Sequence, residues 1–145
     1  MKLTDQTERL YRQIYKNAAM GLGTTSHLLK TARGHHMADA LRLQNAEYSA
    51  ICKNAKSRML ERGKAVKGLS PMEKMRTDGM VSLNLLMDDS DSHVAQMLMT
   101  GSTMGMINAE KQLRKNPSAD PYAKALMRHL SDFEKSTLDK MKGFL

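Results

Sequence analysis

Four stretches of the chain, each a little under thirty residues long, repeat apolar or small residues at intervals of three and four. This spacing places every member of a set on one side of an α-helix. The four sets are Leu10, Ile14, Ala18, Gly21, Thr25 and Leu28; Met37, Leu41, Gln44, Tyr48, Ile51 and Ala55; Val94, Met97, Gly101, Met104 and Asn108; and Tyr122, Leu126, Leu130, Phe133, Thr137 and Met141. No stretch alternates apolar and polar residues as a half-buried strand does, so the sequence predicts an all-α protein.

Turn and capping signals divide the chain into five predicted helices. Gly63 ends the second stretch, and residues 70–73 (Ser-Pro-Met-Glu) combine a capping box with a proline at the first helical position. The predicted helices cover about 5–32, 36–62, 71–87, 92–115 and 121–142. The acidic run at 88–91 supplies caps for the fourth of them, although the apolar phase also allows residues 70–115 to form one kinked helix.

The lengths of the connections predict how these helices pair. Short links make two antiparallel hairpins of the first two and the last two long helices, and a connection of nearly thirty residues, itself partly helical, joins the hairpins. This is the layout of a ferritin-like four-helix bundle with a helical crossover between its second and third helices. We expect residues 1–145 to form this single domain, and a five-helix array is the alternative.

Three segments of the chain resemble small bacterial ferritin-like proteins related to rubrerythrin. They are Ile14-Tyr15-Lys16-Asn17-Ala18-Ala19, the crossover at 70–86, and the closing Phe133-Glu134-Lys135 with Met141-Lys142-Gly143-Phe144-Leu145. The resemblance implies a bundle in which metal-binding members carry one Glu on each of two helices and Glu-x-x-His on the other two. It also includes members of unassigned function and spore-coat-type proteins.

The metal ligands of that family are largely missing from this sequence. Glu47 and Glu134 stand at equivalent places in the two halves, but neither has a His three residues on. Two carboxylates are too few for two metal ions, so we expect no metal, and both glutamates to form ion pairs on helix surfaces. A divergent metal-binding protein that uses Glu47 and Glu134 is the remaining possibility.

Composition favours a reducing compartment and no membrane span. Cys52 is the only cysteine, 14 methionines replace most aromatic residues, and no run of about 18 apolar residues occurs. The polar start of the chain lacks the apolar region of a signal peptide. The expected location is cytoplasmic, and the methionines are expected mainly as flexible core residues.

The net charge of +8 lies mainly in the first predicted hairpin, where residues 1–34 and 35–69 each carry +4. A nucleic-acid surface would use these charges, but most of them fall opposite the apolar stripe, where side chains are solvated. The candidate basic patch consists of Arg9, Arg12, Lys53, Lys56 and Arg58. Aromatic residues make up only 4% of the chain, which is few for base stacking, so we do not expect nucleic acid as a partner.

No arrangement of residues predicts catalysis or a cofactor. Lys53 and Lys56 could lower the pKa of Cys52, but no base–nucleophile pair and no phosphate-binding loop is readable from the spacing. The five histidines are expected to be surface or hydrogen-bonded residues. The sequence therefore predicts a protein that is not an enzyme.

Two stretches of small residues, 21–26 and 100–105, occupy equivalent places in the two halves. The candidates for contact between them are Gly21, Thr25, Gly101 and Met104. We expect a close helix crossing, because small side chains let backbones approach, and a shared pocket or a dimer seam are the alternatives. A non-enzymatic role in assembly or protein interaction, with a second copy or a protein partner, is the function that these features favour.

Overall fold

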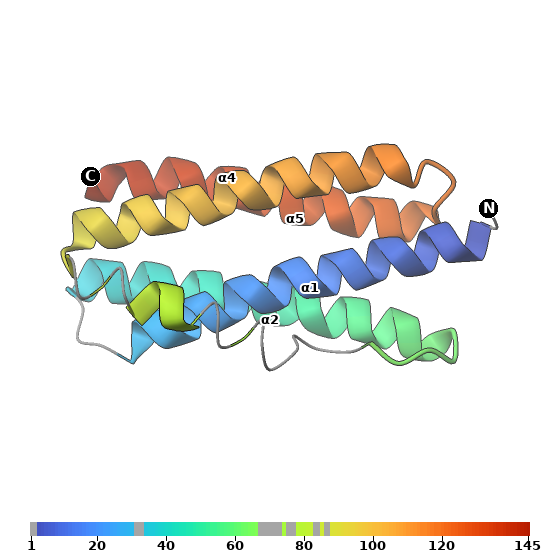
Figure 1. Cartoon of the computed structure of the whole chain (residues 1–145), viewed down its shortest axis with the longest axis horizontal. Coiled ribbons are helices and arrows are strands. Elements are labelled where there is room, and N and C mark those ends of the chain that lie inside the picture. Colours follow the sequence, from blue (N-terminus) through green and yellow to red (C-terminus); the bar gives the residue numbers. More distant parts are fainter. Residues whose placement is uncertain (1–2, 31–33, 67–73, 75–77, 83–84, 86–87) are drawn as a thin grey trace.

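Long helices account for most of the chain. The computed structural model describes residues 3–30, 34–66, 74, 78–82, 85 and 88–145, and within these residues there is no β-strand, which confirms the all-α class. Helices α1 (Leu3–Leu29) and α2 (His35–Glu61) lie antiparallel along each other (Figure 1). Their bounds agree with the predicted ranges to within about three residues.

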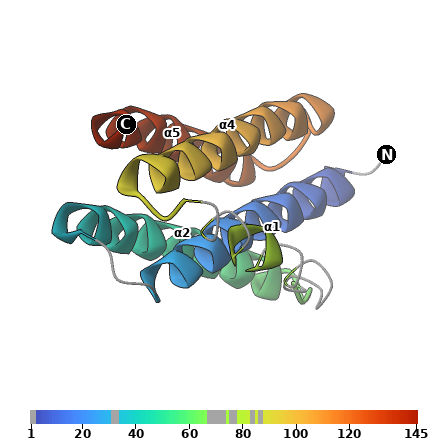
Figure 2. The ribbon, with the colours of Figure 1, turned by 60° about the vertical axis from the view of Figure 1, so that its left-hand side comes forward.

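The second hairpin consists of α4 (Asp91–Lys115) and α5 (Pro121–Met141), followed by the short 3₁₀ helix η1 (Lys142–Phe144). Ser90 caps α4, because its hydroxyl accepts from the backbone N–H of His93 at 3.2 Å. Since residues 88–90 are not helical, a single kinked helix over residues 70–115 is excluded. Figure 2 shows the two hairpins as two layers, α1 with α2 and α4 with α5.

The connection between the hairpins returns along the length of the bundle. Helices α2 and α4 run in the same direction in Figure 1, so the chain must travel back before α4 begins. Gly63 ends α2 as predicted, with φ of 73°, a conformation that favours glycine. Most of the predicted crossover helix at 71–87 lies outside the described residues, and residues 78–82 within it are helical.

Two separate clusters of buried apolar side chains hold the helices together. The first cluster has as its largest fully buried members Leu10, Tyr11, Ile14, Ile51, Met59, Met127 and Leu130. The second cluster consists of Leu28, Met37, Leu41, Val81, Val94, Ala95, Leu98 and Met141. Along α1 the first cluster ends at Ala18 and the second contains Leu28, so neither cluster fills the middle of the bundle.

The predicted inward face of α4 is wrong beyond Val94. The side chains that α4 buries are Val94, Ala95, Leu98, Ser102 and Ala109. Gly101 is exposed and Met104 is 66% exposed, whereas both were expected on the inner stripe. The reason is that small and apolar residues on α4 line an open cavity as well as the core.

Candidate ligand-binding site

A cavity of about 570 Å³ lies between α1 and α4 and reaches the inner faces of α2 and α5. Its lining residues on α1 run from Asn17 to Thr25, and those on α4 run from His93 to Asn108. On α1 the cavity therefore lies in the middle of the bundle, between the residues of the first and second clusters, and on α4 it extends past Leu98 of the second cluster to His93. We call it the central cavity.

Methionines form much of the apolar wall of the central cavity. Met20 comes from α1, Met97 and Met104 from α4, and Met80 with Val81 from the helical turn at 78–82. Met20, Met80 and Met104 are 40%, 59% and 66% exposed, so the methionines lie around the mouth of the cavity. Flexible thioether side chains of this kind adapt to ligands of irregular shape.

Small residues on α4 leave the space that the central cavity occupies. A Cβ atom added at Gly101 would have no atom within 4 Å outside its own helix and chain neighbours, and the nearest atoms to one added at Gly105 belong to the Glu134 side chain. The predicted close crossing at Gly101 is therefore wrong. Gly21 does lie at a close approach, but to the ring of Tyr48 on α2, where an added Cβ would be 2.4 Å from Cζ.

All four predicted contact residues, Gly21, Thr25, Gly101 and Met104, line the central cavity. Thr25 is fully buried, and its hydroxyl donates to the carbonyl oxygens of Gly21 at 2.9 Å and Leu22 at 3.2 Å. Of the three interpretations of these stretches, the shared pocket agrees with this geometry, the close crossing at Gly101 does not, and the dimer seam stays a prediction.

The inner end of the cavity carries a buried polar cluster. The Tyr48 hydroxyl on α2 donates to Oε1 of Glu134 on α5 at 2.6 Å, and the Ser102 hydroxyl on α4 hydrogen-bonds the same carboxyl. Tyr48, Glu134 and Ser102 are only 6%, 4% and 3% exposed. The Tyr48 ring also packs edge-on against Phe133, with ring centroids 5.0 Å apart, which fixes its position.

Burial raises the pKa of the Glu134 carboxyl above its usual value, and the hydrogen bonds from Tyr48 and Ser102 offset this only in part. The pKa of Tyr48 is raised too, first by burial and then by the negative charge of Glu134. No ion pair reaches Glu134 from any residue that the structure describes. Among the described residues, the inner end of the cavity thus presents a carboxyl without a cationic partner.

Two further polar atoms at the cavity lack partners. Nδ2 of Asn17 and Nε2 of His93 are buried and make no hydrogen bond within the described part of the chain. Both residues line the central cavity, from α1 and α4. Buried polar groups are normally satisfied, so these two atoms indicate polar contacts that a bound molecule or water can supply.

The two glutamates that were candidates for metal binding, Glu47 and Glu134, lie in different environments. Glu47 on α2 contacts His129 on α5 at the surface, with 2.6 Å between Oε1 and Nε2, a contact that is an ion pair when the imidazole is protonated. Glu134 is buried and bound to Tyr48, so the expectation of a surface ion pair is wrong for Glu134. Among the residues described, no group of three His, Cys, Asp or Glu side chains could hold a metal ion.

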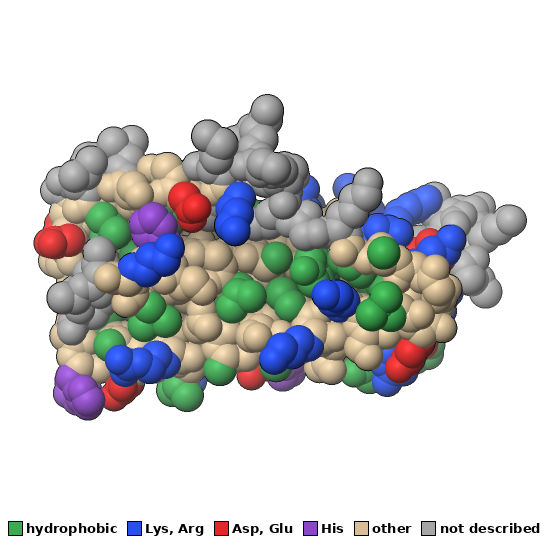
Figure 3. Space-filling model, turned by 90° about the horizontal axis from the view of Figure 1, so that it is seen from below, with side chains coloured by type: hydrophobic (Ala, Val, Ile, Leu, Met, Phe, Trp, Pro, Cys, Tyr) green, Lys and Arg blue, Asp and Glu red, His purple; other side chains and the backbone are tan. Residues whose placement is uncertain are grey.

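The candidate basic patch is dispersed, and both Arg12 and Arg58 make contacts within the protein. Arg12 donates to the carbonyl oxygen of Ala65 at 3.3 Å, and the guanidinium of Arg58 lies 3.6 Å above the Tyr122 ring. Arg9, Lys53 and Lys56 are exposed. On the face that the α1–α2 hairpin forms, Lys and Arg side chains are spread along the molecule with hydrophobic and neutral side chains between them (Figure 3).

Cys52 lies in the first cluster, where burial raises the pKa of its thiol to about 11. The expectation that Lys53 and Lys56 could lower this pKa is wrong, because the thiol points into the core. A thiol with this pKa stays protonated near neutral pH and is a poor nucleophile.

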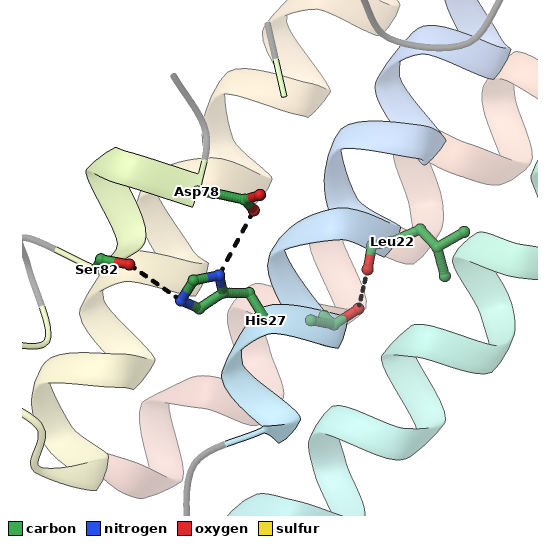
Figure 4. Close-up of polar contacts among 5 residues, drawn as sticks. Leu22, His27, Asp78 and Ser82 are labelled. Carbon is green, nitrogen blue, oxygen red and sulfur yellow. Dashed lines mark hydrogen bonds and ion pairs between the residues drawn. The ribbon is translucent and has the colours of Figure 1, made fainter. Parts of the chain in front are cut away.

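A clasp holds the helical turn at 78–82 against α1 beside the cavity mouth. His27 on α1 lies with Nδ1 3.5 Å from a carboxylate oxygen of Asp78 and with Nε2 3.3 Å from the hydroxyl of Ser82 (Figure 4). Met80 and Val81, which line the cavity, lie between those two residues in the chain. The clasp therefore positions one wall of the cavity.

Comparisons with models of protein families, with curated proteins and with solved structures each found no match for this chain. None of the helices in the described part of the chain is both long and apolar enough to cross a membrane. The geometry of the central cavity is therefore the feature that indicates a function.

Proposed function

We propose that this protein is a non-enzymatic, ferritin-like helical bundle that binds a small, elongated and mostly apolar ligand in its central cavity. The observation that carries the proposal is a cavity of about 570 Å³ that opens between α1 and α4 and ends at the buried Tyr48–Glu134 pair. Pockets of about 300–1,000 Å³ that are mainly apolar, with a few converging polar groups, are typical of small-molecule sites.

The ferritin-like assignment is part of the same proposal. Two antiparallel hairpins joined by a connection that returns along the bundle are the topology of that fold, and the resemblance in residues 14–19 and 133–145 supports it. In this interpretation the central cavity corresponds to the site that holds metal in metal-binding ferritin-like proteins, and the metal ligands have been lost while the cavity remains. The lone Cys52 fits a cytoplasmic location.

The test is binding of the neutral, apolar dye Nile red, whose fluorescence rises when it leaves water. Gly101→Leu adds a side chain to the lining of the cavity and should weaken dye binding by about tenfold or more. Gly23→Leu is the matched control, because Gly23 also has open space around it but does not line the cavity. Equal dye binding by the wild type and Gly101→Leu would contradict the proposal.

A role in assembly is the second candidate, and exposed apolar side chains on α4 favour it. Met104 and Ile107 are 66% and 50% exposed and lie about one helical turn apart. If they form a contact between copies, the wild type should have the solution mass of a dimer and the double variant Met104→Lys/Ile107→Lys that of a monomer. Leu43→Lys on α2, where Leu43 is 68% exposed, serves as the control, and a monomeric wild type rules this candidate out.

A further inference from the structure

We infer that the ligand of the central cavity is an amine: an elongated apolar molecule with one cationic nitrogen that pairs with Glu134. This inference rests on the proposed function, since it names the chemistry of the molecule that the cavity takes. It comes from three features of the cavity: its buried acid, the access to that acid, and the shape of its apolar wall.

The buried acid determines the sign of the charge that the ligand should carry. Glu134 is 4% exposed and has hydrogen bonds from neutral hydroxyl groups, but no positive side chain pairs with it in the described part of the chain. A buried carboxylate is stable only when a cation or several donors compensate it. A protonated amine supplies the missing charge, whereas a carboxylate ligand would add a second negative charge at the same place.

The second carboxyl oxygen can be approached because position 105 is glycine. Tyr48 occupies Oε1 of Glu134, while a Cβ atom at Gly105 would lie 3.3 Å from Oε2 and 3.2 Å from the carboxyl carbon. Any larger residue at position 105 would therefore cover the carboxyl group. Glycine leaves Oε2 accessible to a nitrogen in the cavity, because Glu134 lines the cavity beside this position.

The apolar wall determines the shape of the rest of the ligand. The lining residues of α4 extend from His93 to Asn108, which is about 22 Å along a helix that rises 1.5 Å per residue. Methionines stand along this length, and Glu134 contacts Gly105, near one end of it. A linear alkyl chain with an amine at one end fits both the length and the position of the acid.

The experiment compares three probes with the same chain and different head groups: decylamine, decanol and decanoate, each below its micelle concentration, by isothermal titration calorimetry. The wild type should bind decylamine about tenfold or more tightly than decanol, and decanoate most weakly. Glu134→Gln should lose the preference for decylamine and keep its affinity for decanol within about twofold. Glu47→Gln, which changes a carboxylate outside the cavity, should retain the wild-type order.

The outcomes separate the two proposals. If none of the three probes binds, the proposed function fails, and the inference fails with it. If all three bind equally, or decanoate binds best, the cavity binds ligands but the amine inference is wrong. Gly105→Ala provides a second variant that leaves Glu134 unchanged, and it should weaken decylamine selectively. Unchanged binding of decylamine by both variants would overturn the inference.

Discussion

The two ends of the bundle and its middle are built on different principles. At the ends, the first and second clusters bury large apolar side chains such as Ile14 and Leu41 completely. In the middle, small and polar side chains together with methionines line a cavity, which replaces the packed core. Helices that continue from end to end therefore support an open, partly polar centre.

This difference shows where stability and function lie in the molecule. The clusters at the two ends bury enough apolar surface to hold the four helices in place. The cavity contains a buried acid, Glu134, and polar atoms on Asn17 and His93 that have no partner among the described residues, which a core selected only for stability would not contain. The ends provide the scaffold, and the middle provides the site.

The largest expected effect is a difference in stability between a truncation in the first cluster and one in the wall of the cavity. Ile14→Ala removes a fully buried side chain and should lower the free energy of unfolding by about 2–5 kcal/mol. Met104→Ala removes a side chain of similar size that is 66% exposed, and should change the free energy of unfolding by less than about 0.5 kcal/mol. Urea denaturation of both variants is the measurement, and similar losses in the two would remove the distinction between ends and middle.

The next largest effect distinguishes the two glycines that the sequence placed together. Gly21→Ala would put its Cβ against the Tyr48 ring, which Glu134 and Phe133 hold in place, so stability should fall by about 1–3 kcal/mol. Gly101→Ala meets no atom within 4 Å and should raise stability by up to about 1 kcal/mol, because alanine favours helix. Thermal unfolding of the two variants is the measurement. If Gly101→Ala lowers the midpoint, Gly101 lies at a close helix crossing after all.

The acid in the middle should make stability depend on pH. Because burial raises the folded-state pKa of Glu134 above its usual 4.5, the folded protein holds this proton more tightly than the unfolded chain does. The contribution to stability is therefore present below pH 4.5 and is lost as the pH rises through the folded-state pKa. Glu134→Gln should lack this loss and be more stable than the wild type at pH 8.

Denaturant titrations of both proteins at pH 4.5 and pH 8 provide the measurement, with Glu47→Gln as the control for a carboxylate at the surface. A wild type that gains stability relative to Glu134→Gln as the pH rises would mean that Glu134 has a cationic partner in the folded state.

The smallest expected effect concerns the clasp beside the cavity mouth. His27→Ala removes the contacts to Asp78 and Ser82, which are partly exposed and contribute no more than about 1 kcal/mol. Amide exchange at residues 78–82 should become faster, while the two clusters keep their protection. If exchange is unchanged at 78–82, the clasp does not hold this wall of the cavity.

The sequence predicted the long helices well, because their apolar stripes repeat clearly and their ends carry strong signals such as Pro121 and Gly63. The stripes on α1 and α2 are buried as expected, with Leu10 and Ile51 as examples. On α4 the same reasoning failed, because an apolar residue such as Met104 can face either a packed core or an open cavity. The spacing of apolar residues does not distinguish a core-facing side chain from a cavity-lining one.

The polar pair in the cavity was not predicted, although one signal for it was present. Glu134 continues the spacing of Leu130, Thr137 and Met141, so it lies on the buried face of α5. A charged residue at such a position indicates a buried acid. Its partner Tyr48 is 86 residues away in the chain, and no local pattern joins residues so distant.

The most direct test of the central claim uses the methionine methyl groups as reporters in an NMR titration with decylamine. Met20, Met80, Met97 and Met104 line the cavity, whereas Met37, Met59, Met127 and Met141 are fully buried and lie in the two clusters. We predict that the resonances of the first four shift with saturation at one ligand per chain, and that those of the other four stay in place. Shifts confined to the cluster methionines, or no saturable shift in any of the eight, would contradict a ligand-binding cavity in the middle of the bundle.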